Sequence, residues 1–283
     1  MVEYLIPVGS YPAPNATYIA DGVEPTIGGP VFNVCWYLRQ LGRKVILVAP
    51  YGRNDRALVT RTMRAAGLRC DRLLSSPGYI DVLAAMWRGN THCSAYLRRR
   101  LPSDTASKLL ALCRSGGAFV LAGGRHRAIR STFVKLARSP GYHILGFNPS
   151  YATYEYEAGT LGYLLKRAMV TILNESECDH VCKLLGRVNA STLAKSLRGI
   201  LIITLGSRGA RIYEKDSFLR VSSVAKRISS PFGAGDAFFA GFLQGILSSG
   251  SLAEAGAFAS KVAARVVESP RVRARIDLRF RSQ

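Results

Sequence analysis

Residues 232–242 read Phe232-Gly233-Ala234-Gly235-Asp236-Ala237-Phe238-Phe239-Ala240-Gly241-Phe242. Three small residues lead into a segment whose apolar side chains recur at helical spacing, and this spacing continues through Leu243, Ile246 and Leu247. The stretch therefore predicts a loop that enters the N-terminus of a buried helix.

This predicted loop has the features of an anion site. Glycine lets the backbone approach a ligand closely, and the first N–H groups of a helix point at a negative charge. Asp236 lies in the same turn, so it can accept a proton from a substrate hydroxyl. The backbone of Gly233, Ala234 and Gly235 would meanwhile stabilise a transferring phosphoryl group. The local residues equally allow a simpler interpretation, in which Asp236 caps the helix and the glycines form a turn.

Short apolar runs alternate with helical patterns along the rest of the chain. Strands are expected at 118–121, 142–147, 169–173 and 201–204, with a further strand-like run at 44–48. Helices are expected over 30–41, ended by Gly42, and after Asp55, ended by Gly67. This alternation indicates an α/β fold with a mostly parallel sheet. The runs at 80–87 and 91–97 predict a β-hairpin, which we interpret as part of a lid.

Four motifs occur in an order that resembles the ribokinase-like (PfkB) sugar kinase family. They are Gly28-Gly29-Pro30-Val31-Phe32-Asn33, Asn174-Glu175-Ser176-Glu177, the run from Thr204 to Ala210, and Gly233-Ala234-Gly235-Asp236-Ala237-Phe238 with its following Gly-Phe helix. The resemblance extends over residues 8–267. It implies one three-layer α/β/α domain over 1–283, with a mostly parallel central sheet and a small β lid from segments near 9–27 and 78–101.

The resemblance also implies the reaction and the nucleotide site. The family transfers the γ-phosphoryl of ATP to a hydroxyl of a sugar or sugar-like molecule, with Asp236 in the position of the general base. Residues that would hold ATP are Asn174, Thr204, Gly206 and Gly209. Glu177 would hold Mg²⁺ through water molecules. A helix cap at Asn174 and Glu177 and a bare turn at the glycines are the alternative explanations.

The acceptor site is implied at Gly28, Gly29 and Asn33, which would bind hydroxyl groups. A glycine turn before a helix, with Asn33 on the surface, is the alternative explanation. The acidic residue expected after the first strand is missing, and Asn15 or Asp21 could substitute for it. Tyr96 and Arg98 are similar to a Tyr/Phe-x-Arg segment of fructokinase-like members that reaches an acidic or phosphorylated acceptor. A solvated basic run explains this last segment equally well.

Two further stretches depart from the family pattern. Ser230-Pro231-Phe232 stands where members usually carry Asp-Thr, so activation by K⁺ is left open. Asn148-Pro149-Ser150 stands where Asp-x-Asn is usual, so the acceptor cannot be inherited from a well-known member. Two alternative functions therefore stay open. One is a nucleoside kinase of the same family, and the other is a nucleotide- or sugar-binding sensor that has lost fast phosphoryl transfer.

The amino-acid composition limits the classes of ligand and partner that the protein is expected to bind. Thirty-nine Lys and Arg against 18 Asp and Glu give a net charge of +21, which favours anionic ligands such as nucleotides. The arginines are spread along the chain without interleaved aromatic residues, so nucleic acid is not expected as the main ligand. No signal peptide or long apolar run is present, which predicts a cytoplasmic protein with no membrane partner. The edge of the lid sheet would allow a homodimer.

Overall fold

The computed structural model describes residues 2–5, 25–78, 81–88, 91–98, 101–113, 117–269 and 274–277. A six-stranded sheet in the order β12-β11-β10-β9-β8-β7 forms its centre. Four strands run parallel: β7 (Gly117–Ala122), β8 (Tyr142–Asn148), β9 (Val170–Asn174) and β10 (Ile200–Thr204). They coincide with the four predicted core strands. The hairpin of β11 (Ala210–Glu214) and β12 (Ser217–Val221) adds the antiparallel edge.

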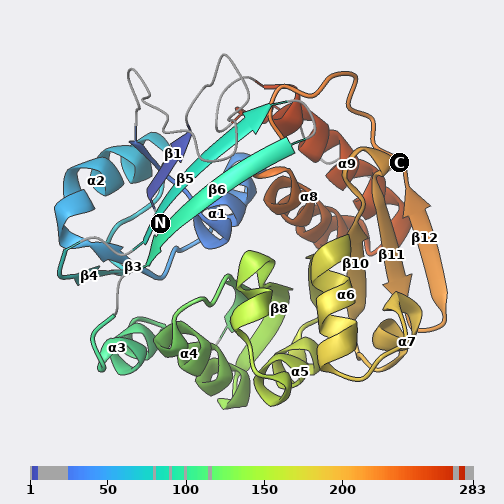
Figure 1. Ribbon diagram of the computed structural model, residues 1–283, viewed down its shortest axis with the longest axis horizontal. Helices are drawn as coiled ribbons and strands as arrows, with labels where there is room; N and C mark the ends of the chain where they lie inside the picture. Colours follow the sequence, from blue (N-terminus) through green and yellow to red (C-terminus); the bar gives the residue numbers. More distant parts are fainter. Residues whose placement is uncertain are drawn as a thin grey trace.

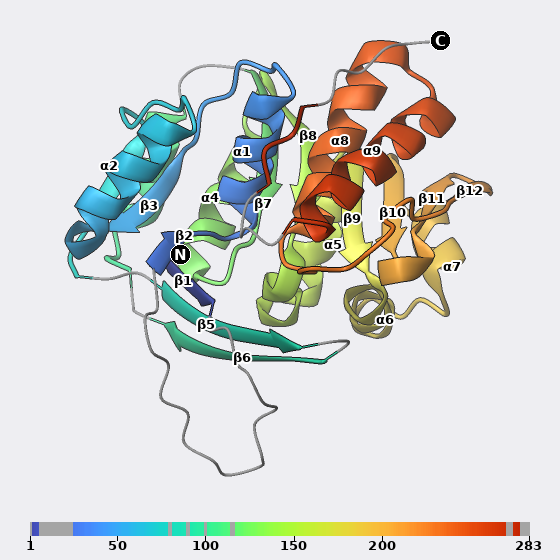
Figure 2. The same cartoon turned by 90° about the horizontal axis from the view of Figure 1, so that it is seen from above.

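Helices cover both faces of this sheet (Figures 1 and 2). One layer contains α1 (Pro30–Gln40), α8 (Ala234–Ser249) and α9 (Leu252–Val267). The other contains α3 (Thr105–Leu112), α4 (Arg127–Arg138), α5 (Ala158–Arg167), α6 (Glu175–Leu184) and α7 (Ala190–Lys195).

Alternate residues of the central strands enter the two layers, because successive side chains of a strand point to opposite faces. Ile172 and Ile202 pack in the core with α1, α8 and α9, whereas Leu173, Leu201 and Ile203 pack in the core with α4 to α7. Continuous apolar strands of this kind are buried on both faces, which requires the three-layer arrangement.

A smaller parallel pair, β3 (Ala49–Gly52) and β4 (Leu73–Ser76), is joined by a 3-10 turn at Arg53–Asp55 and by α2 (Arg56–Ala65). The strand predicted at 44–48 is wrong, since the strand begins only at Ala49. Leu47 is buried and Ile46 is 66% exposed, so the run alternates as a strand does, but only residues 49–52 pair with a neighbouring strand. The two predicted helices are confirmed as α1 and α2.

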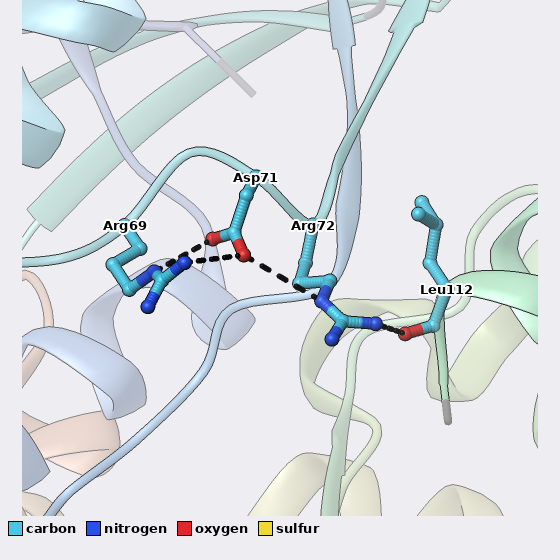
Figure 3. Close-up of polar contacts among 4 residues, drawn as sticks. All are labelled: Arg69, Asp71, Arg72 and Leu112. Atoms are coloured by element: carbon cyan, nitrogen blue, oxygen red, sulfur yellow. Dashed lines mark hydrogen bonds and ion pairs between the residues drawn. The ribbon is translucent and has the colours of Figure 1, made fainter. Parts of the chain in front are cut away.

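The loop after α2 is fixed to α3 by a short chain of polar contacts (Figure 3). Arg69 donates to the Asp71 carboxylate through Nε, at 3.2 Å, and through Nη2, at 3.1 Å. Arg72 Nε lies 3.7 Å from the same carboxylate. Arg72 also donates to the Leu112 carbonyl oxygen at 2.9 Å. One carboxylate therefore serves two arginines at this point.

A second sheet, in the order β2-β1-β5-β6, stands apart from the six-stranded sheet (Figure 2). It consists of β1 (Val2–Leu5), β2 (Pro25–Ile27), β5 (Asp81–Arg88) and β6 (Thr91–Arg98). The antiparallel pairing of β5 with β6 confirms the predicted hairpin. Most of the proposed lid segment 9–27 lies outside the described residues. Within the described ranges, no helix has the length and apolar character needed to cross a bilayer.

Candidate active site

The N-terminus of α8 is built by the glycine-rich stretch. Gly233 is the N-cap in a left-handed conformation, with φ of 78°, which a glycine adopts without strain. Asp236 is the third residue of the helix, so the interpretation of Asp236 as the N-cap is wrong. A Cβ atom placed on Gly235 would meet no atom within 4 Å. The first turn of α8 therefore has open space for a ligand.

The carboxylate of Asp236 is held by two buried amide groups. Asn33 Nδ2, in the first turn of α1, donates to Asp236 Oδ2 at 2.8 Å. Asn148 Nδ2, at the end of β8, donates to Asp236 Oδ1, also at 2.8 Å. The two asparagines are only 8% and 5% exposed. The motif around Asn33 and the motif around Asp236, 203 residues apart, thus meet in one site.

Asn148 is the residue of this group that sequence reasoning missed. The sequence marks Asn148 only as a departure from the family pattern, although this residue follows a predicted core strand. Because ligand-binding side chains collect at the carboxyl ends of parallel strands, its position was the available signal.

The glycine pair lies directly before α1. Gly29 is the N-cap of that helix, with φ of 95°, and its carbonyl oxygen accepts the backbone N–H of Asn33 at 3.0 Å. Gly28 and Gly29 also line a mainly apolar cavity of about 530 Å³, whose lining includes Arg125 and Tyr151. The structure therefore brings the predicted acceptor residues Gly28, Gly29 and Asn33 to the same place as Asp236.

Asn174 and Glu177 form a reciprocal capping box at the start of α6. Asn174 Oδ1 accepts the Glu177 N–H at 2.8 Å, and Glu177 Oε2 accepts the Asn174 N–H at 2.9 Å. Burial raises the pKa of Glu177 to about 7; the hydrogen bond from Asn174 opposes this rise, and the charge of Asp236 adds to it. The two carboxyl groups are therefore electrostatically coupled. Glu177 is the only residue predicted to hold a metal, and the described residues contain no cluster of three or more His, Cys, Asp or Glu.

Asn174 and Thr204 end adjacent strands and are direct partners in the β9–β10 register. Thr204 Oγ1 donates to the Leu173 carbonyl oxygen at 3.4 Å. Gly206 is exposed and has open space around it. At Gly209, with φ of 88°, a Cβ atom would lie 1.9 Å from the Val221 carbonyl oxygen. Gly209 is therefore required by the turn before β11, while Gly206 faces open space.

The described structure does not test the remaining predicted acceptor residues. Asn15 and Asp21 lie outside the described residues. Tyr96 and Arg98 lie in β6, opposite Leu83 and Asp81 of β5 in the strand register. A contact of these two side chains with the acceptor therefore stays a prediction.

Comparisons with known proteins identify similar kinases. The chain is 25% identical over 271 residues to a nucleoside kinase of Methanothermobacter thermautotrophicus, covering 94% of this chain and 86% of that protein. Its fold is similar to a nucleoside kinase of Burkholderia thailandensis in complex with inosine, with a TM-score of 0.80, 22% identity, and coverage of 95% and 88%. It is also similar to an uncharacterized sugar kinase of Pyrococcus horikoshii in complex with ATP, with a TM-score of 0.74, 18% identity, and coverage of 96% and 91%.

The predicted ribokinase-like fold is confirmed by these structural neighbours. The family model described as "pfkB family carbohydrate kinase" matches residues 4–278, which is nearly the whole chain. The protein is therefore an enzyme of the transferase class, and the chain belongs to the pfkB family of carbohydrate kinases.

Proposed function

We propose that this kinase transfers the γ-phosphoryl of ATP to a sugar hydroxyl, and that the ribosyl hydroxyl of a nucleoside is the favoured acceptor. The observation that carries the reaction is the carboxylate of Asp236, fixed by two amides beside the open N-terminus of α8. Relatives named nucleoside kinases support the acceptor. A sugar without a base is the alternative acceptor, favoured by a relative named a sugar kinase.

The chemistry follows from the two halves of the site. The acceptor lies between Gly28, Gly29, Asn33 and the sheet of β1, β2, β5 and β6, which acts as the lid. Asp236 takes the hydroxyl proton as the acceptor oxygen forms its bond to the γ-phosphorus. The bond between the γ-phosphorus and the bridging oxygen breaks, and ADP leaves with the electron pair. The backbone N–H groups at the start of α8 stabilise the charge on the phosphoryl oxygens.

The nucleotide is expected along Asn174, Thr204 and Gly206, at the carboxyl edge of the sheet. Glu177 suits a magnesium site, because its buried carboxyl is already coupled to the charge of Asp236 and a divalent cation would stabilise both. When bound, Mg²⁺ would neutralise the phosphate oxygens of ATP.

The test is ADP release from ATP and Mg²⁺ over a panel of nucleosides, sugars, sugar acids and sugar phosphates, with and without K⁺. Asp236→Asn should retain ATP binding and lose turnover by about 10²-fold or more. Unchanged turnover in that variant would remove Asp236 as the base. Nucleotide binding without acceptor-dependent ADP release would instead indicate a sensor that has lost phosphoryl transfer.

A further inference from the structure

We propose that Asn148 is a positioning residue of the kinase, which together with Asn33 orients Asp236 and keeps its carboxylate ionised. The inference rests on the proposed function of Asp236. Each carboxylate oxygen accepts one amide N–H at 2.8 Å, and the two donors come from different elements. Rotation of the carboxylate would therefore break both hydrogen bonds.

Both donors are themselves fixed. Asn33 lies in the first turn of α1, where its backbone N–H binds the Gly29 carbonyl oxygen. Asn148 ends β8, and its carbonyl oxygen accepts the Gly123 N–H at 2.8 Å, which ties it to the end of β7. The orientation of Asp236 is thus set by α8, which carries it, and by α1 and β8, which carry its two donors. An in-line reaction requires a base that is fixed in this way.

The chemistry of an amide explains why asparagine suits position 148. Its N–H₂ group donates hydrogen bonds but cannot accept the proton, so it stabilises the ionised carboxylate without competing for the acceptor proton. Glu177 adds a second acidic group to the same site, and its charge would disfavour ionisation of Asp236. Two amide donors offset that repulsion, whereas an aspartate at position 148 would increase it.

The experiment compares Asn148→Leu, which keeps the side-chain volume and removes the donor, with Asn148→Asp and with Asn189→Ala. Asn189 also makes side-chain hydrogen bonds but is exposed at the start of α7. Asn148→Leu should lower kcat by about 10²-fold with little change in the acceptor KM. Its acidic limb of the kcat–pH profile should move to higher pH, further in Asn148→Asp, and not at all in Asn189→Ala.

Wild-type kcat and an unmoved acidic limb in Asn148→Leu would overturn the inference. A carbon NMR titration of the Asp236 carboxylate separates this outcome from failure of the proposed function. If Asp236→Asn keeps its turnover, the base assignment fails. The positioning inference still requires the Asp236 carboxylate to titrate at higher pH in Asn148→Leu than in the wild type, and equal titrations would refute it.

A second inference comes from a separate surface on α2. A shallow groove there is lined by Arg53, Arg56, Arg61 and Arg64, with the small residues Ala57 and Thr60 between them. We call this the arginine groove. All six residues are exposed, whereas Val59 and Met63 on the opposite face of α2 are buried. The groove is about 16 Å long, given the rise of an α-helix, and Figures 1 and 2 place α2 far from α8 and α9.

The part of the chain that the structure describes offers no partner for the charge of this groove. Among the described residues, none forms an ion pair or hydrogen bond with the four arginine side chains. Asp55, at the start of α2, is buried, and burial raises the pKa of its carboxyl. The nearby Arg69 and Arg72 differ, because both contact Asp71 (Figure 3). The four arginines of the groove thus concentrate positive charge, whereas the neighbouring arginines outside it are paired with a carboxylate.

We infer that the arginine groove binds the phosphate backbone of a nucleic acid duplex. Guanidinium groups match phosphate oxygens in geometry, and a duplex carries one charge per about 1.7 Å of its axis. The groove offers no aromatic side chain on which single-stranded bases could stack, and no large apolar side chain to enter a lipid surface. Contacts to the backbone alone are independent of sequence, so the duplex is a secondary ligand rather than a substrate.

The test measures fluorescence anisotropy of a labelled duplex of about 20 base pairs between about 50 and about 200 mM NaCl. Arg56→Gln, Arg61→Gln and Arg64→Gln are combined in one variant. Its control combines Arg187→Gln, Arg198→Gln and Arg220→Gln, three exposed arginines elsewhere that give the same change in charge. The first variant should weaken binding about tenfold or more and reduce the salt slope by about two to three, while the control keeps both.

Equal losses in the two triple variants would show a general effect of net charge and refute the groove. Absence of duplex binding by the wild type at about 50 mM NaCl, or binding only to vesicles containing anionic lipid, would refute the nucleic acid partner. Kinase activity should be unchanged in the groove variant, because none of its residues lies in the proposed catalytic site.

Discussion

Asn174 and Glu177 cap the start of α6 reciprocally, and the carboxyl group of this pair is buried with a pKa of about 7. In the unfolded chain, Glu177 has its ordinary pKa of 4.5 and loses its proton above that pH. Between these two values the folded state holds a proton that the unfolded state has released. The contribution of Glu177 to the free energy of unfolding therefore falls as pH rises from about 4.5 to about 7, by up to about 3 kcal/mol.

Glu177→Gln should remove this dependence, since the neutral amide can still accept the Asn174 N–H. We expect the variant to be more stable than the wild type at about pH 8, by about 1 to 3 kcal/mol, and similar at about pH 5. Urea denaturation at both pH values measures the difference. Glu175→Gln, a change at the neighbouring exposed glutamate, serves as the control. The same stability difference at both pH values would contradict the buried, proton-binding state of Glu177.

A variant at Gly235 tests the open space at the start of α8. Gly235→Val should fold normally, because its Cβ atom meets nothing within 4 Å. The added side chain would occupy the expected phosphate position, so turnover should fall by about tenfold or more while the free energy of unfolding changes by about 1 kcal/mol. Thermal unfolding and ADP release measure the two effects.

Gly159 provides the matched control for this variant. It is also the second residue of a helix, α5, and a Cβ atom placed on it would likewise meet nothing within 4 Å. Gly159→Val should change stability by a similar amount and leave turnover unchanged. If Gly235→Val is as active as Gly159→Val, the start of α8 is not the phosphate site.

The sequence was informative where one local pattern determined one structure. The stretch from Gly233 to Phe242 predicted the turn and the buried helix, because helical spacing and glycine conformation are local properties. The run at 44–48 was misassigned because a strand also needs a hydrogen-bonding neighbour, which the run itself does not specify. Asn148 was missed for a related reason: its contact with Asp236 joins residues 88 apart, and only the folded sheet brings them together.

Some positions of the predicted nucleotide site could likewise be inferred from the sequence, and others could not. Asn174 and Thr204 could be placed side by side from the sequence, since parallel strands end at one edge of a sheet. The separate needs of Gly206 and Gly209 could not, because the contact between Gly209 and the Val221 backbone depends on how the β11–β12 hairpin folds back. A glycine-rich motif can therefore combine a ligand position with a purely structural one.

Alanine substitutions should separate these two roles. Gly209→Ala places a Cβ atom 1.9 Å from the Val221 carbonyl oxygen and 2.7 Å from the Ser223 nitrogen. Because both atoms belong to the backbone, the hairpin must shift, and we expect a loss of about 3 kcal/mol or more. Gly206→Ala meets no atom and should lose only about 1 kcal/mol, the cost of its left-handed backbone.

Chemical denaturation gives the stability of both variants, and the KM for ATP gives their effect on the nucleotide. Gly206→Ala should raise that KM more than its small loss of stability explains, because its new methyl group projects into the space proposed for ATP. Gly209→Ala that remains folded should bind ATP nearly as the wild type does. Equal stabilities of the two variants would contradict the close backbone contact at Gly209, and an unchanged KM in Gly206→Ala would move the nucleotide away from this turn.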